Sequence, residues 1–209
     1  MRIYQLSSSG FASARLSDNA ELRRFFADSL ADYRGAPLSG FPALRYGPHG
    51  KPYFSEAAFS GLFFSLSHTM GFAALVFAES EVGIDAENMA AHAWDDERLL
   101  KIARRCFREG EFAYVRAAAG SASAVTAAGR GTPQEQQAGV RKRFFEIWTR
   151  KEAFMKFTGN GFSEGFQSFS VLGPGRARFD TRFAEEDPEV VVSVCAEEGE
   201  FECERRREG

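Results

Sequence analysis

Two carboxylates separated by one residue, Asp85 and Glu87, are the first candidates for chemistry in this sequence of 209 residues. On a strand, residues i and i+2 project from the same face, so these carboxylates would lie side by side. Hard cations such as Mg²⁺ take oxygen ligands in this arrangement, commonly one or two carboxylates together with substrate phosphates. The alternative is a solvated strand face. Taken by itself, the pair favours this alternative, because a two-residue motif occurs often by chance. The preceding apolar run and Gly83 place the pair at the edge of a core, which favours the metal site.

A second group of candidates lies in the segment FFEIWTRKEAFMKF, at 144–157, whose apolar residues recur at helical spacing. Glu152 and Lys156 are four residues apart and therefore lie on one face of this helix. The simpler interpretation is an ion pair between them, which contributes about 0.2–0.5 kcal/mol. The functional interpretation is a carboxylate base beside an ammonium group that binds phosphate. The spacing alone favours the simpler interpretation.

Several other polar residues could contact an anion. Ser67 and His68 end a predicted strand, although a lone histidine more often makes a structural hydrogen bond or is exposed. In HGKP at 49–52, Gly50 allows the backbone to approach a ligand closely, and Lys51 supplies a positive charge. Basic residues nearer the N-terminus that could reach a phosphate are Arg15, Arg23 and Arg24. Each of these signals is weak by itself, since any solvated helix surface carries such residues.

The elements that must position these residues follow from periodicity and turn signals. Helical spacing predicts helices over 18–33, 95–107 and 142–158. Alternation and short apolar runs predict strands near 61–67, 72–78, 82–87, 166–172, 176–179 and 190–195. Residues 116–139 are rich in Ala, Gly and Ser, and we expect a mobile surface insertion there, with or without a helical start. Each half of the chain thus contains a helix followed by strands, which allows two similar α+β halves.

The composition is that of an ordinary globular chain, with 44% hydrophobic residues, 26% charged residues and a net charge of −3. The 22 phenylalanines exclude a disordered chain, and the small negative charge argues against a protein that coats nucleic acid. The cysteines form no CxxC pair, which favours a reducing compartment. The longest apolar run, 72–78, is too short to span a bilayer, and the first residues lack the apolar run of a signal peptide. We therefore predict a soluble, cytoplasmic protein that binds neither nucleic acid nor membranes.

The motifs that contain these candidates follow one another in a characteristic order. They are GKP at 50–52, FSLSH at 64–68, GIDAE at 83–87, FREGEF at 107–112 and WTRKEAFMKFTGNG at 148–161. In this order they resemble the 4'-phosphopantetheinyl transferases, specifically the long, monomeric type that activates surfactin synthetase (the Sfp type). The resemblance covers 50–161, while the N-terminal 49 residues and those after 175 match only in length and style.

The resemblance implies both a fold and an activity. The fold would be an α+β pseudo-dimer of two similar half-domains, 1–82 and 83–209, with the active site in the cleft between them. The reaction would transfer the 4'-phosphopantetheine arm of coenzyme A to a serine hydroxyl of an apo acyl or peptidyl carrier protein. It would depend on Mg²⁺ and release adenosine 3',5'-bisphosphate.

The resemblance also implies a role for each matched residue. Asp85, Glu87 and Glu111 would be the ligands of Mg²⁺. Glu152 would take the proton from the carrier serine, directly or through water, and Lys156 would hold the pyrophosphate of coenzyme A. Contacts to the phosphates of coenzyme A would come from Lys51, Ser67, His68 and Lys156, and from Arg24 at the 3'-phosphate, with Arg15 and Arg23 as alternatives.

The insertion at 116–139 lies where this family contacts its carrier protein. Basic residues flank it, and they could dock an acidic carrier or could equally form an ordinary solvated helix face. These residues are Arg104, Arg105, Arg108, Arg141, Lys142 and Arg143. Two rival functions also stay open: a coenzyme A-binding module without catalysis, and a metal-dependent pyrophosphate hydrolase that uses the same acids. The first rival is disfavoured because the acids and the KEA-x-x-K pattern are intact.

Overall fold

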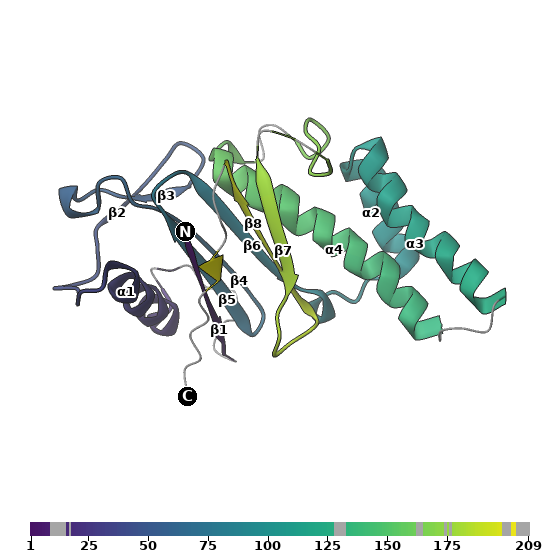
Figure 1. Ribbon diagram of the computed structural model, residues 1–209, viewed down its shortest axis with the longest axis horizontal. Coiled ribbons are helices and arrows are strands. Elements are labelled where there is room, and N and C mark those ends of the chain that lie inside the picture. The colour runs from purple at the N-terminus through teal and green to yellow at the C-terminus, as the bar shows by residue number, and fades with distance from the viewer. Residues whose placement is uncertain are drawn as a thin grey trace.

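Figure 1 shows the computed structural model, which describes residues 1–8, 16, 18–127, 133–161, 165–173, 175, 177–197 and 202–203. Its α-helices are α1 (Ala20–Arg34), α2 (Asp96–Cys106), α3 (Glu109–Ala127) and α4 (Pro133–Thr158). Its strands are β1 (Arg2–Ser7), β2 (Leu44–Tyr46), β3 (Pro52–Phe54), β4 (Phe63–Thr69), β5 (Phe72–Ala78), β6 (Val82–Asn88), β7 (Arg178–Phe183), β8 (Val190–Ala196) and β9 (Glu202–Cys203). Short 3₁₀ helices lie at η1 (Ala57–Phe59) and η2 (Met89–Ala91).

Two sheets pack against each other between helices. The first sheet has the strand order β4-β5-β1-β9, and the second has the order β6-β8-β7. On one face of β5, Leu75 and Phe77 pack with Phe26 of α1, while on the other face Val76 packs with Ile84 of β6. Because α4 covers the remaining face of β6 and β8, the layers are helix, sheet, sheet and helix (Figure 1).

The two sheets are joined along β4 and β6 by side-chain hydroxyls. The backbone N–H of Ile84 donates to the hydroxyl of Ser65 at 3.1 Å, and that of Asn88 donates to the hydroxyl of Thr69 at 3.2 Å. These residues alternate along β4 with side chains that face α1. The seam between β4 and β6 is therefore polar, although it lies between two hydrophobic cores.

Most of the predicted regular elements are present. The helices predicted over 18–33 and 95–107 are α1 and α2, each begun by a capping side chain: Asn19 accepts from Leu22 N, and Asp95 accepts from Arg98 N. The apolar run at 72–78 is β5, which is buried on both faces in the middle of its sheet, as predicted. The mixed α+β class is confirmed.

Other elements differ from the prediction. The described parts of 116–139 are helical: residues 116–127 continue α3, and residues 133–139 begin α4. The physical reason is that alanine, which is abundant here, favours helix more than any other residue. Residues 166–172 are turns and bends, so the strand predicted there was wrong. Strand β1 was not predicted; its Ile3, Tyr4 and Leu6 are buried. Among the described residues, helices lack the length and apolar character needed to cross a membrane.

Candidate active site

Three elements bring a charged cluster together at the polar seam. Lys156, in the last turns of α4, ion-pairs with Asp85 of β6 at 2.7 Å, and its ammonium group also donates to the hydroxyl of Ser67 on β4 at 2.9 Å. The Ser67 hydroxyl lies 2.9 Å from the same Asp85 oxygen, Oδ1. Asp85 is buried, while the Lys156 side chain is 31% exposed. Lys156 therefore joins the two sheets at the site and still reaches solvent.

The predicted ion pair between Glu152 and Lys156 is replaced by a contact of much longer range. Lys156 ion-pairs with Asp85, which is 71 residues away in sequence, and not with Glu152, which lies one turn earlier on the same helix. Burial, followed by the negative charge of Asp85, raises the pKa of Glu152 from 4.5 to about 7, against the opposing charge of Lys156. Near pH 7, the neutral and ionised forms of Glu152 are therefore comparably populated.

Asp85, Glu87 and Glu152 form an acidic group at this seam. Asp85 and Glu87 share one face of β6, as predicted, and their charges also act on Glu152. Burial and the charge of Asp85 raise the pKa of Glu87, while a hydrogen bond with His92 lowers it. The second oxygen of Asp85, Oδ2, is buried and has no hydrogen-bond partner among the described residues. Several like charges and an unpartnered oxygen are what a bound cation would compensate.

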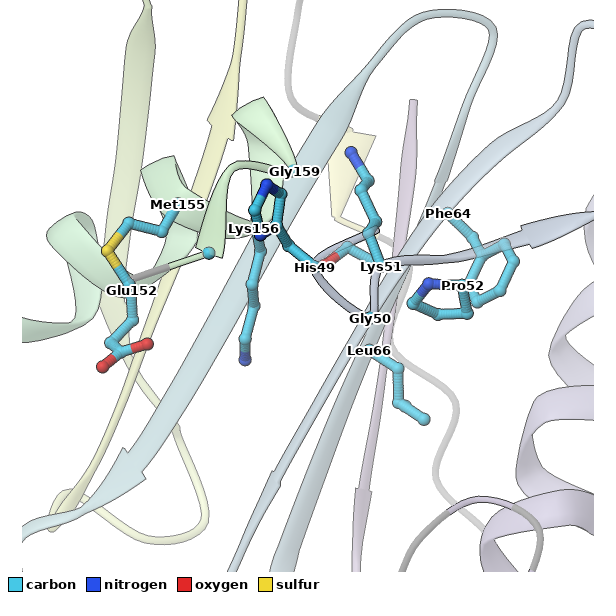
Figure 2. A pocket seen from close by; sticks show the side chains of 12 residues that line it. His49, Gly50, Lys51, Pro52, Phe64, Leu66, Glu152, Met155, Lys156 and Gly159 are labelled. Carbon is cyan, nitrogen blue, oxygen red and sulfur yellow. The ribbon is translucent and has the colours of Figure 1, made fainter. Parts of the chain in front are cut away.

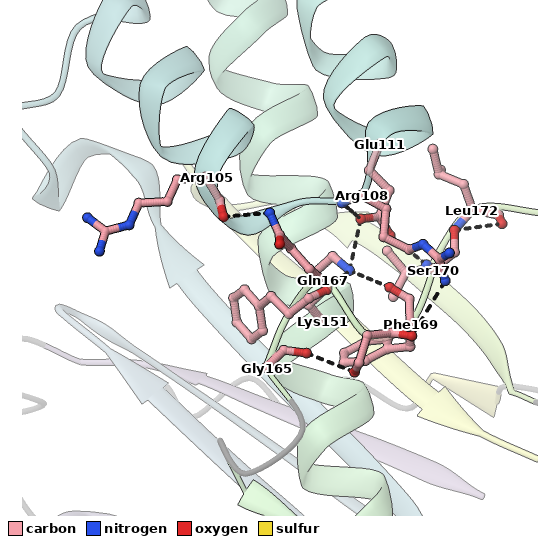
Figure 3. Close-up of polar contacts among 12 residues, drawn as sticks. Arg105, Arg108, Glu111, Lys151, Gly165, Gln167, Phe169, Ser170 and Leu172 are labelled. Atoms are coloured by element: carbon pink, nitrogen blue, oxygen red, sulfur yellow. Dashed lines mark hydrogen bonds and ion pairs between the residues drawn. The ribbon is translucent and has the colours of Figure 1, made fainter.

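Glu111 does not belong to this group. Its side chain is completely buried and forms an ion pair with Lys151 at 2.8 Å (Figure 3). One of its carboxylate oxygens also accepts from the backbone N–H of Arg108, and the other accepts from that of Val171. Within the described residues, no three acidic, histidine or cysteine side chains already stand in a metal-binding arrangement. Both carboxylate oxygens of Glu111 therefore have hydrogen-bond partners within the protein. The third acid that lies near Asp85 and Glu87 is Glu152.

A pocket of about 320 Å³ opens beside the cluster. Figure 2 shows that the side chains of Glu152 and Lys156 extend in the same direction along it. Its lining comes from the loop before β3, from β4 and from the end of α4: His49, Gly50, Lys51, Pro52, Phe64, Ser65, Leu66, Glu152, Met155, Lys156, Gly159 and Gly161. The pocket therefore lies between β4 and the C-terminal end of α4, with the charged cluster at one side.

Lys51, which is predicted to contact a phosphate, also lines this pocket and makes contacts within the protein. Its ammonium group points away from that of Lys156 in Figure 2 and donates to the carbonyl of Phe157 at 2.9 Å. It also ion-pairs with Glu81. A lysine at the C-terminus of a helix stabilises its unpaired carbonyls. In this structure Lys51 thus caps α4 and attaches the 49–52 loop to it.

The other residues predicted to contact phosphates lie in different parts of the structure, and not all of them are near the pocket. Side chains alternate along β4, so His68 shares the face of Leu66, which lines the pocket, while Ser67 faces Asp85. Arg24 is exposed on α1, and the guanidinium of Arg23 lies over the ring of Phe41. Of the described side chains that line the pocket, none comes from α1. Arg15 lies outside the described residues.

Two of the basic residues that could dock a carrier make contacts within the fold instead. Arg141 donates to the carbonyls of Met89, His92 and Trp94. Arg143 donates to the carbonyl of Tyr114 and lies over its ring. By contrast, Arg104, Arg105, Arg108 and Lys142 are exposed. Arg141 and Arg143 are therefore removed from the candidate docking surface.

Comparison with known proteins agrees with this geometry. The family model of the 4'-phosphopantetheinyl transferase superfamily matches residues 81–204, which include β6, the acidic group and α4. The chain belongs to this superfamily. The matches to individual members span about half the length of those curated relatives.

Three relatives illustrate the range of similarity within the superfamily. The 4'-phosphopantetheinyl transferase AcpT of Salmonella typhimurium is 37% identical over 123 residues, covering 58% of this chain and 52% of the relative. The 4'-phosphopantetheinyl transferase HetI of Nostoc sp. is 32% identical over 121 residues, covering 57% of this chain and 42% of the relative. The 4'-phosphopantetheinyl transferase of Bacillus subtilis is 27% identical over 164 residues, covering 73% of this chain and 62% of the relative.

Proposed function

We propose that this protein transfers the 4'-phosphopantetheine arm of coenzyme A to a serine hydroxyl of an apo acyl or peptidyl carrier protein. The observation that carries the proposal is the cluster of Lys156, Asp85 and Ser67 beside the acid Glu152, at the edge of a pocket between β4 and the end of α4. In a member of this superfamily, such a cluster is suited to holding a pyrophosphate next to a proton acceptor.

Asp85 and Glu87 are the proposed ligands of Mg²⁺. They supply oxygen atoms, which hard cations prefer, and the buried Oδ2 of Asp85 has no partner among the described residues. When bound, the ion would polarise the pyrophosphate oxygens and offset their charge. Glu111 has no part in this proposal, because its oxygens are paired with Lys151 and two backbone N–H groups.

The remaining steps are assigned to Glu152 and Lys156. The serine oxygen attacks the phosphorus atom that carries the pantetheine arm, and its proton passes to the Glu152 carboxylate, directly or through water. A group whose pKa is about 7 is well matched to this transfer. The bond between that phosphorus and the bridging oxygen breaks, and its electron pair leaves with adenosine 3',5'-bisphosphate. The Lys156 ammonium offsets the charge that develops on the leaving phosphate.

The proposed architecture is a monomeric pseudo-dimer with halves at 1–82 and 83–209, as in the Sfp type. It is supported by the presence of one mainly antiparallel sheet and one covering helix on each side of the β4–β6 seam. The proposed setting is the cytoplasm, without nucleic acid or membrane partners. The proposed coenzyme A contacts are Lys156 and Ser67 at the cluster, Lys51 and His68 at the pocket, and Arg24, with Arg15 and Arg23 as alternatives, at the 3'-phosphate.

One assay tests the proposal against its rivals. The protein is mixed with coenzyme A, Mg²⁺ and an apo carrier protein, and the carrier is then weighed by mass spectrometry. We expect the carrier to gain one phosphopantetheine arm, with one adenosine 3',5'-bisphosphate released per arm. Release of the bisphosphate without carrier modification would identify a hydrolase. Binding of coenzyme A without any product, over several apo carriers, would identify a binding module.

A further inference from the structure

A histidine lies against the acidic group from a segment with no assigned role. The Nε2 atom of His92 is 3.2 Å from Oε2 of Glu87, and both side chains are about one-quarter exposed. When Glu87 is ionised, its carboxylate can only accept a hydrogen bond, so we assign the proton to Nε2, which donates to Oε2. Glu87 is therefore held at one of its two oxygens, which leaves the other oxygen for a ligand.

The ring of His92 is itself held by aromatic packing. Its centroid lies 4.4 Å from that of Trp94 and 5.2 Å from that of Phe145 on α4. Packing against these two tilted rings restrains the plane of the imidazole and hence the direction of its N–H. Mobility of the ring would weaken the bond to Glu87, so packing and hydrogen bonding act together.

The backbone that carries His92 is also attached to α4. The guanidinium of Arg141 donates to the carbonyls of Met89, His92 and Trp94. At the start of this segment, the side chain of Asn88 accepts from the N–H of Ala90. The segment from the end of β6 to Trp94 is thus fixed to α4. It holds the imidazole of His92 in place beside Glu87.

We propose that His92 is a positioning residue for Glu87: it holds this carboxylate in the orientation that binds the metal ion. The inference rests on the proposed function, because it presumes that Glu87 is a metal ligand. Groups that orient metal ligands are needed for tight binding, and their loss typically weakens metal affinity by about 10–100-fold. Glu87 needs such support because it lies beside the like charge of Asp85.

The test measures Mn²⁺ binding in the absence of coenzyme A and carrier, from the electron paramagnetic resonance signal of free Mn²⁺. His92→Phe keeps an aromatic ring between Trp94 and Phe145 and removes only the donor. We expect it to weaken Mn²⁺ binding by roughly 10-fold or more. His92→Gln restores an N–H donor and is expected to bind within about 3-fold of the unaltered protein, even though its stacking is lost.

Trp94→Phe is the matched control, since it reduces the packing around His92 while keeping the donor. If the role of His92 were only structural, Mn²⁺ affinity would fall with thermal stability in all three variants. Equal affinity in His92→Phe and the unaltered protein would overturn the inference and leave the proposed function intact. Direct coupling of Mn²⁺ to an imidazole nitrogen that disappears in His92→Phe would instead make His92 a ligand. Failure of the unaltered protein to bind Mn²⁺ would overturn the metal site and the inference together.

Discussion

Gly83 of β6 lies directly against the backbone of Ala153 on α4. A Cβ atom on Gly83 would stand 2.0 Å from the carbonyl oxygen of Ala153 and 2.4 Å from the backbone nitrogen of Phe157. Real side chains do not approach backbone atoms this closely. The glycine therefore lets the helix and strand touch, which brings Lys156 within 2.7 Å of Asp85.

Gly83→Ala is expected to destabilise the protein by at least about 2 kcal/mol, because the clash involves backbone atoms that a rotamer change cannot move. The free energy of unfolding would be measured by urea denaturation. Gly110→Ala on α3 is the control: its Cβ would meet nothing within 4 Å, so it should be neutral or stabilising by up to about 1 kcal/mol. Equal stability of Gly83→Ala and the unaltered protein would contradict the close contact.

Lys156→Ala is expected to reduce phosphopantetheine transfer by at least about 100-fold, because the charge assigned to the leaving phosphate is lost. Mass spectrometry of the carrier protein measures the rate, and circular dichroism checks that the fold is retained. Lys101→Ala, which removes an exposed lysine paired only with Glu97 on α2, should keep full activity. The site assignment would be wrong if Lys156→Ala were as active as Lys101→Ala.

Glu152→Gln is expected to stabilise the metal-free protein at pH 8 while abolishing transfer. The pKa of Glu152 is raised to about 7 in the folded state, so between about pH 4.5 and 7 the folded state binds more protons than the unfolded state. Stability from this group is therefore present at low pH and lost as the pH rises through 7. Glutamine avoids that loss, which corresponds to roughly 1–3 kcal/mol at pH 8.

Thermal unfolding of Glu152→Gln and the unaltered protein across pH 4.5–8 measures this difference. The stability gap should widen as the pH rises and level off above about 7. A gap that is constant with pH would show that the pKa of Glu152 is not raised in the folded state.

Glu111→Gln is expected to cost about 3–5 kcal/mol of stability without changing Mn²⁺ affinity of the folded protein. It leaves the buried ammonium of Lys151 without its counter-charge, in a place where burial already lowers the lysine's pKa. Chemical denaturation and Mn²⁺ titration measure the two quantities. The double variant Glu111→Gln with Lys151→Met should recover part of the stability, since the unpaired charge is gone. Weaker Mn²⁺ binding at unchanged stability would restore Glu111 as a metal ligand.

Local patterns predicted the elements that depend on short-range geometry. The period of two put Asp85 and Glu87 on one face of β6, and helical spacing predicted the two helices that the structure has as α1 and α2. The strand expected at 166–172 failed for a long-range reason. The carbonyls of Phe166 and Phe169 accept from Lys151, and the N–H of Val171 donates to Glu111. Backbone groups used in this way are not available to a sheet.

The sequence by itself determined the family resemblance, the main helices and strands, and the acids on β6, because these depend on residue types at fixed local spacing. Only the tertiary structure decided which charges meet. Lys156 pairs with Asp85 across the seam instead of with Glu152 on its own helix, and Glu111 pairs with Lys151 instead of joining Asp85 and Glu87. The reason is that a charge buried during folding is stabilised by whichever partner the packed elements bring within hydrogen-bond distance, and spacing along the chain does not specify that partner.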